Sequence, residues 1–403
     1  MHTRDRVSVG IGLALLVGGA VAVGTGAFPA HEASALAERV WGILLFVVAM
    51  TIVAELSSRA GLFDVAARVV IQAAGSRSWR LWLLISAFTL ACTIFLSLDT
   101  TVVLLTPMVV VLSRRIGLDP KPFALTVVWL ANTGSMLLPI SNLTNLLAAN
   151  KVAQGSPAQF ASLMWPVAVV CAVVPMVLIA LVFRRELGAA PTLAPNSPLI
   201  STGRPFAYAA QLFARRPLLA ISAVVVSALI IALLAGAEVW IPATVAALAL
   251  VAAYALMDRS ALTWHLVPLP MIVLTAGLFL AMGAVGSMFV HEAVGNLLAQ
   301  DDSSATLLGT AALGAGGANL INNLPAYLAL EPLAHSPATM VALLVGVNAG
   351  PLITPWASLA TLLWHERLVA TGVHVSWSRY ILLGAVAAPL IIIAAWLALL
   401  VQF

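Results

Sequence analysis

The sequence predicts an all-α polytopic membrane protein that contains an inverted structural repeat, with two re-entrant helical hairpins and two broken transmembrane helices. Three observations lead to this prediction: a composition dominated by apolar residues, a series of apolar segments of membrane-spanning length, and a polar motif that occurs once in each half of the chain. The predicted N-terminal half covers residues 1–183, and the inverted C-terminal half covers residues 217–403.

The composition excludes an ordinary soluble protein. Of the 403 residues, 62% are apolar and 8% are charged, whereas soluble domains average about 25% charged residues. The net charge of +4 comes from single or paired basic residues without a basic run, which excludes nucleic acid as a partner and leaves membrane lipid. Cys92 and Cys171 lie in separate apolar segments without ligand spacing, so we expect neither a disulfide nor a metal site.

Nine apolar segments have the length that a membrane crossing needs, which is about 20 residues. They are the segments 7–27, 40–57, 122–149, 160–183, 217–235, 239–257, 267–287, 337–364 and 380–401. We take the first as a retained helix rather than a cleaved signal segment. Two further regions, 79–113 and 305–334, each contain two apolar segments of which the second is short, so we expect a re-entrant hairpin in each.

The basic residues predict the orientation in the membrane. With the N-terminus in the cytoplasm, nine crossings place Arg39 and Lys151 outside and the other 17 of the 19 Lys and Arg residues inside, as the positive-inside rule requires. The C-terminus is then outside. The longest polar stretch, 184–216, contains five arginines and is expected to form a cytoplasmic linker between the halves.

The repeated motif aligns residues 132–147 with residues 348–363 without a gap. Besides leucines, the copies share three pairs: Asn132 and Asn348, Gly134 and Gly350, Pro139 and Pro355. Because Gly and Pro weaken a helix, we expect the segments 122–149 and 337–364 to break there. By the charge count the two copies cross in opposite directions, an arrangement typical of secondary transporters.

Each predicted broken helix follows a hairpin with a polar turn, at residues 97–101 in the first half and 319–323 in the second. Two turns and two breaks are expected to meet near the middle of the membrane, where irregular backbone is tolerated only beside a cavity or inside protein. The candidate substrate ligands are therefore neutral donors and acceptors: Thr100, Asn132, Ser141, Asn142, Asn145, Asn322, Asn323, Asn348, Thr354 and Ser358. The alternative, that these side chains only hold helices together, stays open.

Asp99 is the one acidic residue expected at membrane depth away from a helix end. Burying a carboxylate is costly unless it is neutralised, so Asp99 is predicted to carry a proton and to couple transport to it. A second role can coexist, in which Asp99 caps the hairpin tip by accepting from backbone N–H groups. Glu331 and His335 fall at the outer end of the second hairpin and are expected to be solvated, with a gating role left open.

These motifs resemble the ion transporter superfamily, most closely the ArsB-type arsenite and antimonite permeases, which are related to citrate and dicarboxylate permeases. The resemblance rests on four stretches: 98–107, 141–145, 322–325 and 350–364. It implies a scaffold and a transport domain, an elevator-type movement, often a homodimer, and a place in the cytoplasmic membrane of a prokaryote. Such permeases typically carry charged residues where this chain has Asn132, Asn348 and Leu352, so part of the family's charged set is neutral here.

The function that the sequence favours is proton-coupled efflux of arsenite or antimonite. Arsenious acid is mainly uncharged near neutral pH and presents three hydroxyls, which suit Asn, Ser and Thr side chains without a nearby Lys or Arg. The alternative is a sodium-coupled di- or tricarboxylate permease or a cation/proton antiporter of the same superfamily. No enzyme is expected, because no nucleophile with a base stands near the predicted centre, and the broken repeats argue against a channel. No cofactor is expected beyond the coupling ion, H+ or Na+, and a soluble ATPase partner is left open.

Overall fold

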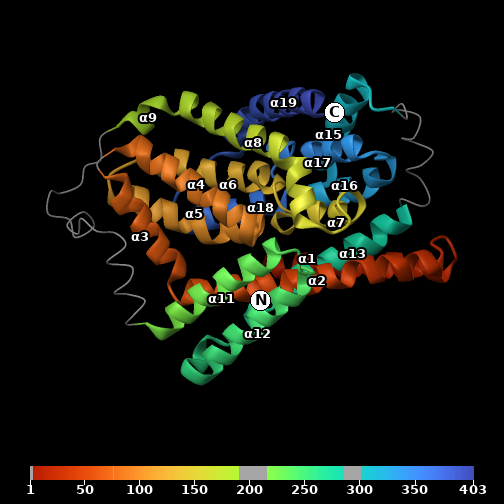
Figure 1. Ribbon diagram of the computed structural model, residues 1–403, viewed down its shortest axis with the longest axis horizontal. Coiled ribbons are helices and arrows are strands. Elements are labelled where there is room, and N and C mark those ends of the chain that lie inside the picture. The colour runs from red at the N-terminus through yellow and green to blue at the C-terminus, as the bar shows by residue number, and fades with distance from the viewer. Residues whose placement is uncertain (1–2, 76, 190–215, 286–300) are drawn as a thin grey trace.

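The computed structural model describes residues 3–75, 77–189, 216–285 and 301–403. Within these ranges the chain forms helices joined by turns and no strand (Figure 1). The prediction of an all-helical membrane protein is confirmed. Most of the expected linker, residues 190–215, lies outside the described residues.

The first half of the chain begins with α1 (Thr3–Gly24), α2 (Ala30–Arg59), α3 (Leu62–Ala74), α4 (Ser78–Leu96), α5 (Leu98–Arg115) and α6 (Pro120–Thr133). It continues with the short 3₁₀ helices η1 (Gly134–Met136) and η2 (Pro139–Ser141), then α7 (Leu143–Val152), α8 (Pro157–Val182) and α9 (Arg184–Gly188). Helix α6 therefore stops in the middle of the expected segment 122–149, and the chain becomes α-helical again only at α7.

The second half begins with α11 (Pro217–Leu234), α12 (Trp240–Met257), η3 (Arg259–Ala261), η4 (Trp264–Leu266) and α13 (Leu269–Val285). It continues with α15 (Ser304–Ile321), α16 (Asn323–Leu330), η6 (Glu331–Leu333), α17 (Pro337–Ala349), α18 (Leu359–Ala370) and α19 (Trp377–Gln402). Residues 350–358 separate α17 from α18 without a helix.

Local sequence explains where several of these helices begin. Asp119, Ser156 and Ser336 are N-caps whose side chains accept hydrogen bonds from the first turn of α6, α8 and α17. Each is followed directly by a proline, whose missing N–H costs nothing at the first helical position. These starts fix the lengths of the helices on either side of the interruptions.

Among the described residues, six helices are long and apolar enough to cross a membrane: α2, α4, α8, α11, α12 and α19. Shorter apolar helices lie in α1, α13 and α17. The sequence assigned α4 to a re-entrant hairpin, whereas its 19 residues have the length and composition of a crossing. Large apolar side chains such as Leu181, Leu248 and Leu382 are exposed, as expected of helices that face lipid.

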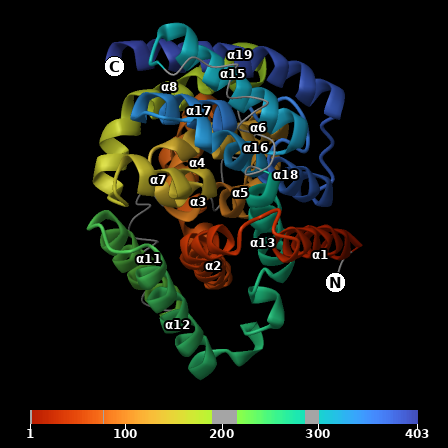
Figure 2. The ribbon, with the colours of Figure 1, turned by 90° about the vertical axis from the view of Figure 1, so that its right-hand side faces the viewer.

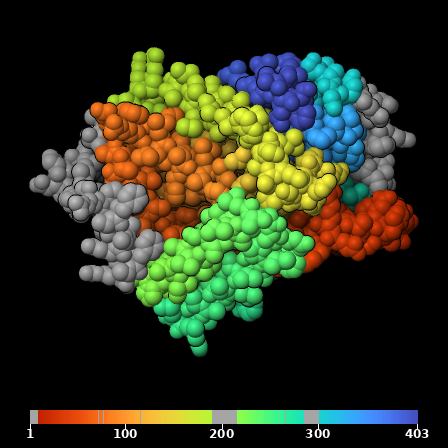
Figure 3. Space-filling view, in the orientation of Figure 1, coloured from red at the N-terminus to blue at the C-terminus, as the bar shows by residue number. Residues whose placement is uncertain are grey.

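The helices form two groups. The first helical group contains α1, α2, α11, α12 and α13, and the second contains α4 to α8 and α15 to α19 (Figure 2). In the first group α1 packs on α13 and α2 on α12, while in the second α15 packs on α17 and α19 on α8. Helices α11 and α12 form the lower front surface in Figure 3. The two groups meet where α2 and α13 contact α5 and α16.

Close backbone approaches position the second interruption. A Cβ added to Gly346 of α17 would lie 2.2 Å from the carbonyl oxygen of Ala311 on α15, and one on Gly384 of α19 would lie 1.8 Å from that of Leu352. Neither position has room for a side chain. Helix α17 is thus held against α15, and residues 350–358 are held against α19.

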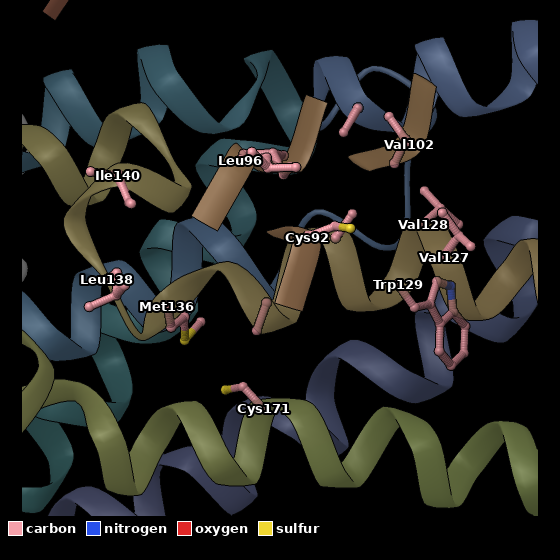
Figure 4. Packing of buried hydrophobic residues seen from close by; sticks show 14 of the residues in the cluster. Cys92, Leu96, Val102, Val127, Val128, Trp129, Met136, Leu138, Ile140 and Cys171 are labelled. Atoms are coloured by element: carbon pink, nitrogen blue, oxygen red, sulfur yellow. The ribbon is translucent and has the colours of Figure 1, made fainter. Parts of the chain in front are cut away.

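The apolar core of the second group surrounds the interrupted helix of the first half. Cys92 and Leu96 of α4, Trp129 of α6 and Met136 of η1 belong to one buried apolar cluster, part of which Figure 4 shows. Cys171 reaches this cluster from α8, and both cysteines are buried and free. The irregular backbone that follows α6 is therefore inside protein.

Candidate functional site

Amide side chains hold the interruption in the first half. Asn142 is the N-cap of α7, and its Oδ1 accepts a 3.4 Å hydrogen bond from the backbone N–H of Thr144. The Nδ2 of Asn145 donates to the carbonyl oxygens of Ser135, at 2.7 Å, and Leu138, at 3.2 Å. These carbonyls lie outside any α-helical ladder, so Asn145 satisfies acceptors that lipid could not.

Asn348, near the end of α17, joins the two halves of the chain through one amide. Its Oδ1 accepts from the Nδ2 of Asn142 at 2.8 Å and from the Oγ1 of Thr144 at 3.0 Å. Its Nδ2 donates to the Oδ1 of Asn145 at 2.9 Å. All four side chains are buried. We call these residues, Asn142, Thr144, Asn145 and Asn348, the amide network.

A cavity of about 50 Å³ lies between the two helical groups and borders the amide network at Asn142. Its polar side is formed by Ser97, Asp99, Thr100 and Asn142. The remaining lining residues are Phe46, Val47, Met50, Thr51, Leu98, Ile140, Leu143, Leu146 and Met271. Among the described residues, the lining thus contains one acidic residue and no basic residue, in a space large enough for a few water molecules or a small solute.

Ser97 shapes the turn between α4 and α5. It has a positive φ of 95°, which is strained for a residue other than glycine. Its Oγ accepts a 3.4 Å hydrogen bond from the backbone N–H of Thr100, and its carbonyl oxygen accepts from the N–H and the hydroxyl of Thr101. The capping role expected of Asp99 is wrong, because Ser97 is the residue that caps α5.

The capping bond of α5 does not use the side chain of Asp99, which lies in the first turn of the helix. Its Oδ1 is buried and has no hydrogen-bond partner among the described residues. The residue lines the cavity. A buried carboxyl oxygen without a donor is costly when charged, which favours the protonated form until a base or solvent reaches it.

The turn between α15 and α16 has a similar backbone shape. Asn322 has φ 126° and ψ 156°, close to the ψ of 157° at Ser97, and its Oδ1 accepts from the N–H of Leu324 at 3.3 Å. Its Nδ2 donates to the carbonyl oxygen of Trp356 at 2.9 Å. Thr354 donates to the carbonyl oxygen of Asn319, also at 2.9 Å. The turn is therefore fastened to the segment 350–358.

The residues that the sequence predicts to bind the substrate lie in three different environments. Asp99, Thr100 and Asn142 line the cavity, with Asn145 and Asn348 behind them in the amide network. Asn322, Asn323 and Thr354 belong to the second turn, where the N–H of Asn323 donates to Ala357 at 2.8 Å. The remaining three are Asn132, bonded to Val128, Ser141, bonded to Ile94, and Ser358, whose buried Oγ has no partner among the described residues.

The surroundings of Glu331 differ from those that the sequence predicted. It is only 5% exposed, so the expectation that it is solvated is wrong. Its carboxylate pairs with both terminal nitrogens of Arg39, accepts from Tyr327 at 3.0 Å and lies 3.4 Å from the Nζ of Lys151. His335 is exposed and lies 3.6 Å from Asp302. The buried acid joins α2 of the first helical group to α7 and η6 of the second.

Arg39→Gln is expected to lower the free energy of unfolding by about 1–3 kcal/mol. The change removes two charge-assisted bonds to a buried carboxylate, but Lys151 still neutralises Glu331, so the cost stays below that of an unpaired buried charge. Thermal unfolding of the purified protein in detergent measures the effect. Arg367→Gln, at an exposed position on α18, is the control. Equal unfolding temperatures for the two variants would contradict a stabilising role of the cluster.

Comparison with known proteins identifies a family of membrane transporters. Residues 3–361 match the family model described as a citrate transporter, CitMHS. The chain belongs to the CitMHS family. This match covers the first helical group, the second group up to the start of α18, and every residue that lines the cavity.

Curated relatives of this CitMHS protein carry a different substrate in their names. The arsenical pump membrane protein of Escherichia coli K12 is 26% identical over 399 residues, covering 94% of this chain and 90% of that protein. The protein of the same name from Yersinia enterocolitica is 25% identical over 368 residues, covering 86% and 83%. The resemblance to arsenite permeases is therefore confirmed at the level of the family.

A solved structure with a similar fold is also a transporter. The Alcanivorax borkumensis YdaH transporter, described as having an unusual topology, superimposes with a TM-score of 0.51 at 15% identity. The match covers 98% of this chain and 97% of that one. Together the family and these relatives establish an integral membrane protein that transports solutes.

Proposed function

We propose that this CitMHS-family transporter exports arsenite and antimonite across the cytoplasmic membrane in exchange for protons. The observation that carries the proposal is the cavity, whose polar side offers one carboxyl group with neutral amide and hydroxyl groups and, among the described residues, no basic side chain. Relatives named arsenical pump membrane proteins, which match over most of the chain, support the same substrate.

The carboxyl group of Asp99 favours a neutral solute over an anionic one. A citrate or dicarboxylate ion would approach Asp99 without a basic side chain in the lining to compensate it. When Asp99 has released its proton, two like charges 4 Å apart repel by about 4 kcal/mol at an effective dielectric constant of 20. Arsenious acid avoids this repulsion because it is neutral, and its three hydroxyls match the donors and acceptors of Ser97, Thr100 and Asn142.

Asp99 supplies the proposed coupling. Its carboxyl group binds a proton from the outer side and releases it to the cytoplasm. Its Oδ1, which has no hydrogen-bond partner among the described residues, can bond to the solute or to water. The N-terminus lies in the cytoplasm in this proposal, so that Arg39, Lys151 and Glu331 mark the outer end of the transporter. Export then draws on the proton gradient.

The second candidate function is sodium-coupled transport of a di- or tricarboxylate. The description of the matching family as a citrate transporter favours it. The two candidates differ in the charge of the substrate and in the coupling ion. They therefore predict opposite results in the following experiment.

Expression in a host stripped of its own arsenic efflux is expected to raise tolerance to arsenite and antimonite but not to arsenate, which is an anion. Growth at graded concentrations of each salt measures this. The Cys92→Ala, Cys171→Ala double variant is the control and should protect equally, because both thiols only pack in the core. Unchanged tolerance together with sodium-dependent uptake of citrate would support the second candidate instead.

A further inference from the structure

The carboxyl and amide groups of the cavity lining come from one helical group, and its two methionines come from the other. Ser97, Asp99, Thr100 and Asn142 belong to the second group. The first group contributes Phe46, Val47, Met50 and Thr51 from α2 and Met271 from α13. Two thioethers therefore border the same small space as the carboxyl, hydroxyl and amide groups.

A thioether differs from the other apolar groups of this lining. Sulfur is more polarizable than hydrocarbon, and soft thioether ligands favour soft, heavy elements. Methionine also fills gaps in cores, and Met50, only 3% exposed, packs in the core of the protein. A gap-filling role would require only the volume of the side chain, whereas a ligand role requires the sulfur, and this difference can be tested by substitution.

We infer that Met50 and Met271 are specificity-determining residues that favour hydroxides of heavy trivalent metalloids over hydroxides of light elements. Three hydroxyls on one side of the solute bind the polar side of the cavity, and the large polarizable central atom contacts the thioethers. Boric acid offers three hydroxyls and is neutral, but its central atom is small and hard. Antimonite gains more from the sulfur contact than arsenite, because antimony is the more polarizable atom. This inference rests on the proposed function.

The test measures initial uptake of antimonite, arsenite and boric acid into everted vesicles that contain the wild type, Met50→Leu, Met271→Leu or the double variant. Leucine keeps an apolar side chain of similar volume and removes the sulfur. We expect the double variant to lower the antimonite-to-arsenite uptake ratio by about fivefold to tenfold, which corresponds to a difference of about 1–1.4 kcal/mol between the contact energies that the two solutes lose. Uptake of boric acid relative to arsenite should rise, and a constant ratio would contradict a preference over light elements.

Controls separate loss of sulfur from loss of folding. Met164→Leu on α8 removes a fully buried sulfur that does not line the cavity, and its uptake ratios should equal those of the wild type. Amounts of folded protein are compared by gel filtration in detergent, and ratios between solutes are independent of that amount. A double leucine variant with unchanged ratios would overturn this inference and leave the proposed function intact. A wild type that carries neither metalloid would overturn the proposed function, and this inference with it.

Discussion

Asp99→Asn is expected to abolish transport driven by a pH gradient while leaving the protein folded. An amide cannot alternate between a charged and a neutral form, so the exchange of substrate for a proton loses its carrier. The turn before α5 should survive, because Ser97 and not Asp99 makes the capping bond to Thr100. Solute exchange at equal pH on both sides, which needs no proton, should persist.

Uptake of arsenite into everted vesicles with an acidic lumen measures this prediction. Asp119→Asn is the matched control: it makes the same chemical change at an exposed N-cap, where asparagine caps as well as aspartate. The control should transport like the wild type. Undiminished gradient-driven uptake by Asp99→Asn would exclude Asp99 as the proton carrier.

Asn348→Leu is expected to destabilise the protein strongly and to abolish transport. The change removes three hydrogen bonds and leaves Asn142, Thr144 and Asn145 buried without these partners. Each unmet buried group costs about 1–3 kcal/mol. The unfolding temperature in detergent and the yield of folded protein should both fall.

Two further variants test the cause. Asn348→Asp, whose buried carboxyl group favours the protonated form, keeps acceptors for Asn142 and Thr144 and an O–H donor for Asn145, so it should be less harmful than leucine. Asn150→Leu, at an exposed position near the end of α7, should leave the unfolding temperature unchanged. If Asn348→Leu unfolds at the temperature of Asn150→Leu, the amide network does not hold the two halves together.

The features that sequence predicted well are those that local chemistry decides. Apolar composition gave the helical membrane fold, and the Gly and Pro residues of the repeated motif lie where the structure interrupts the helices, at 134–142 and 350–358. The polar stretches 97–101 and 319–323 each contain the one residue, Ser97 or Asn322, that separates two consecutive helices. The inverted relation of the halves and the re-entrant nature of the hairpins stay predictions.

The repeat predicted that the two breaks approach each other, whereas the individual contacts between distant helices were beyond sequence reasoning. Apolar periodicity does not say which helix faces which, so the pairing of Asn348 with Asn142 could not be foreseen. Met50 and Met271 carry no motif, since they stand in apolar segments like any core residue. Glu331 had a signal that was missed: Arg39 and Lys151, the two basic residues expected outside, both pair with it.

The most direct test uses purified protein in proteoliposomes with an acidic lumen and a neutral exterior. Arsenite uptake and the pH of the lumen are recorded together. The account predicts uptake that depends on the pH gradient and raises the lumen pH as arsenite enters, with no requirement for sodium. Arsenite uptake that does not depend on the pH gradient would contradict the account, and so would sodium-driven citrate uptake without arsenite uptake.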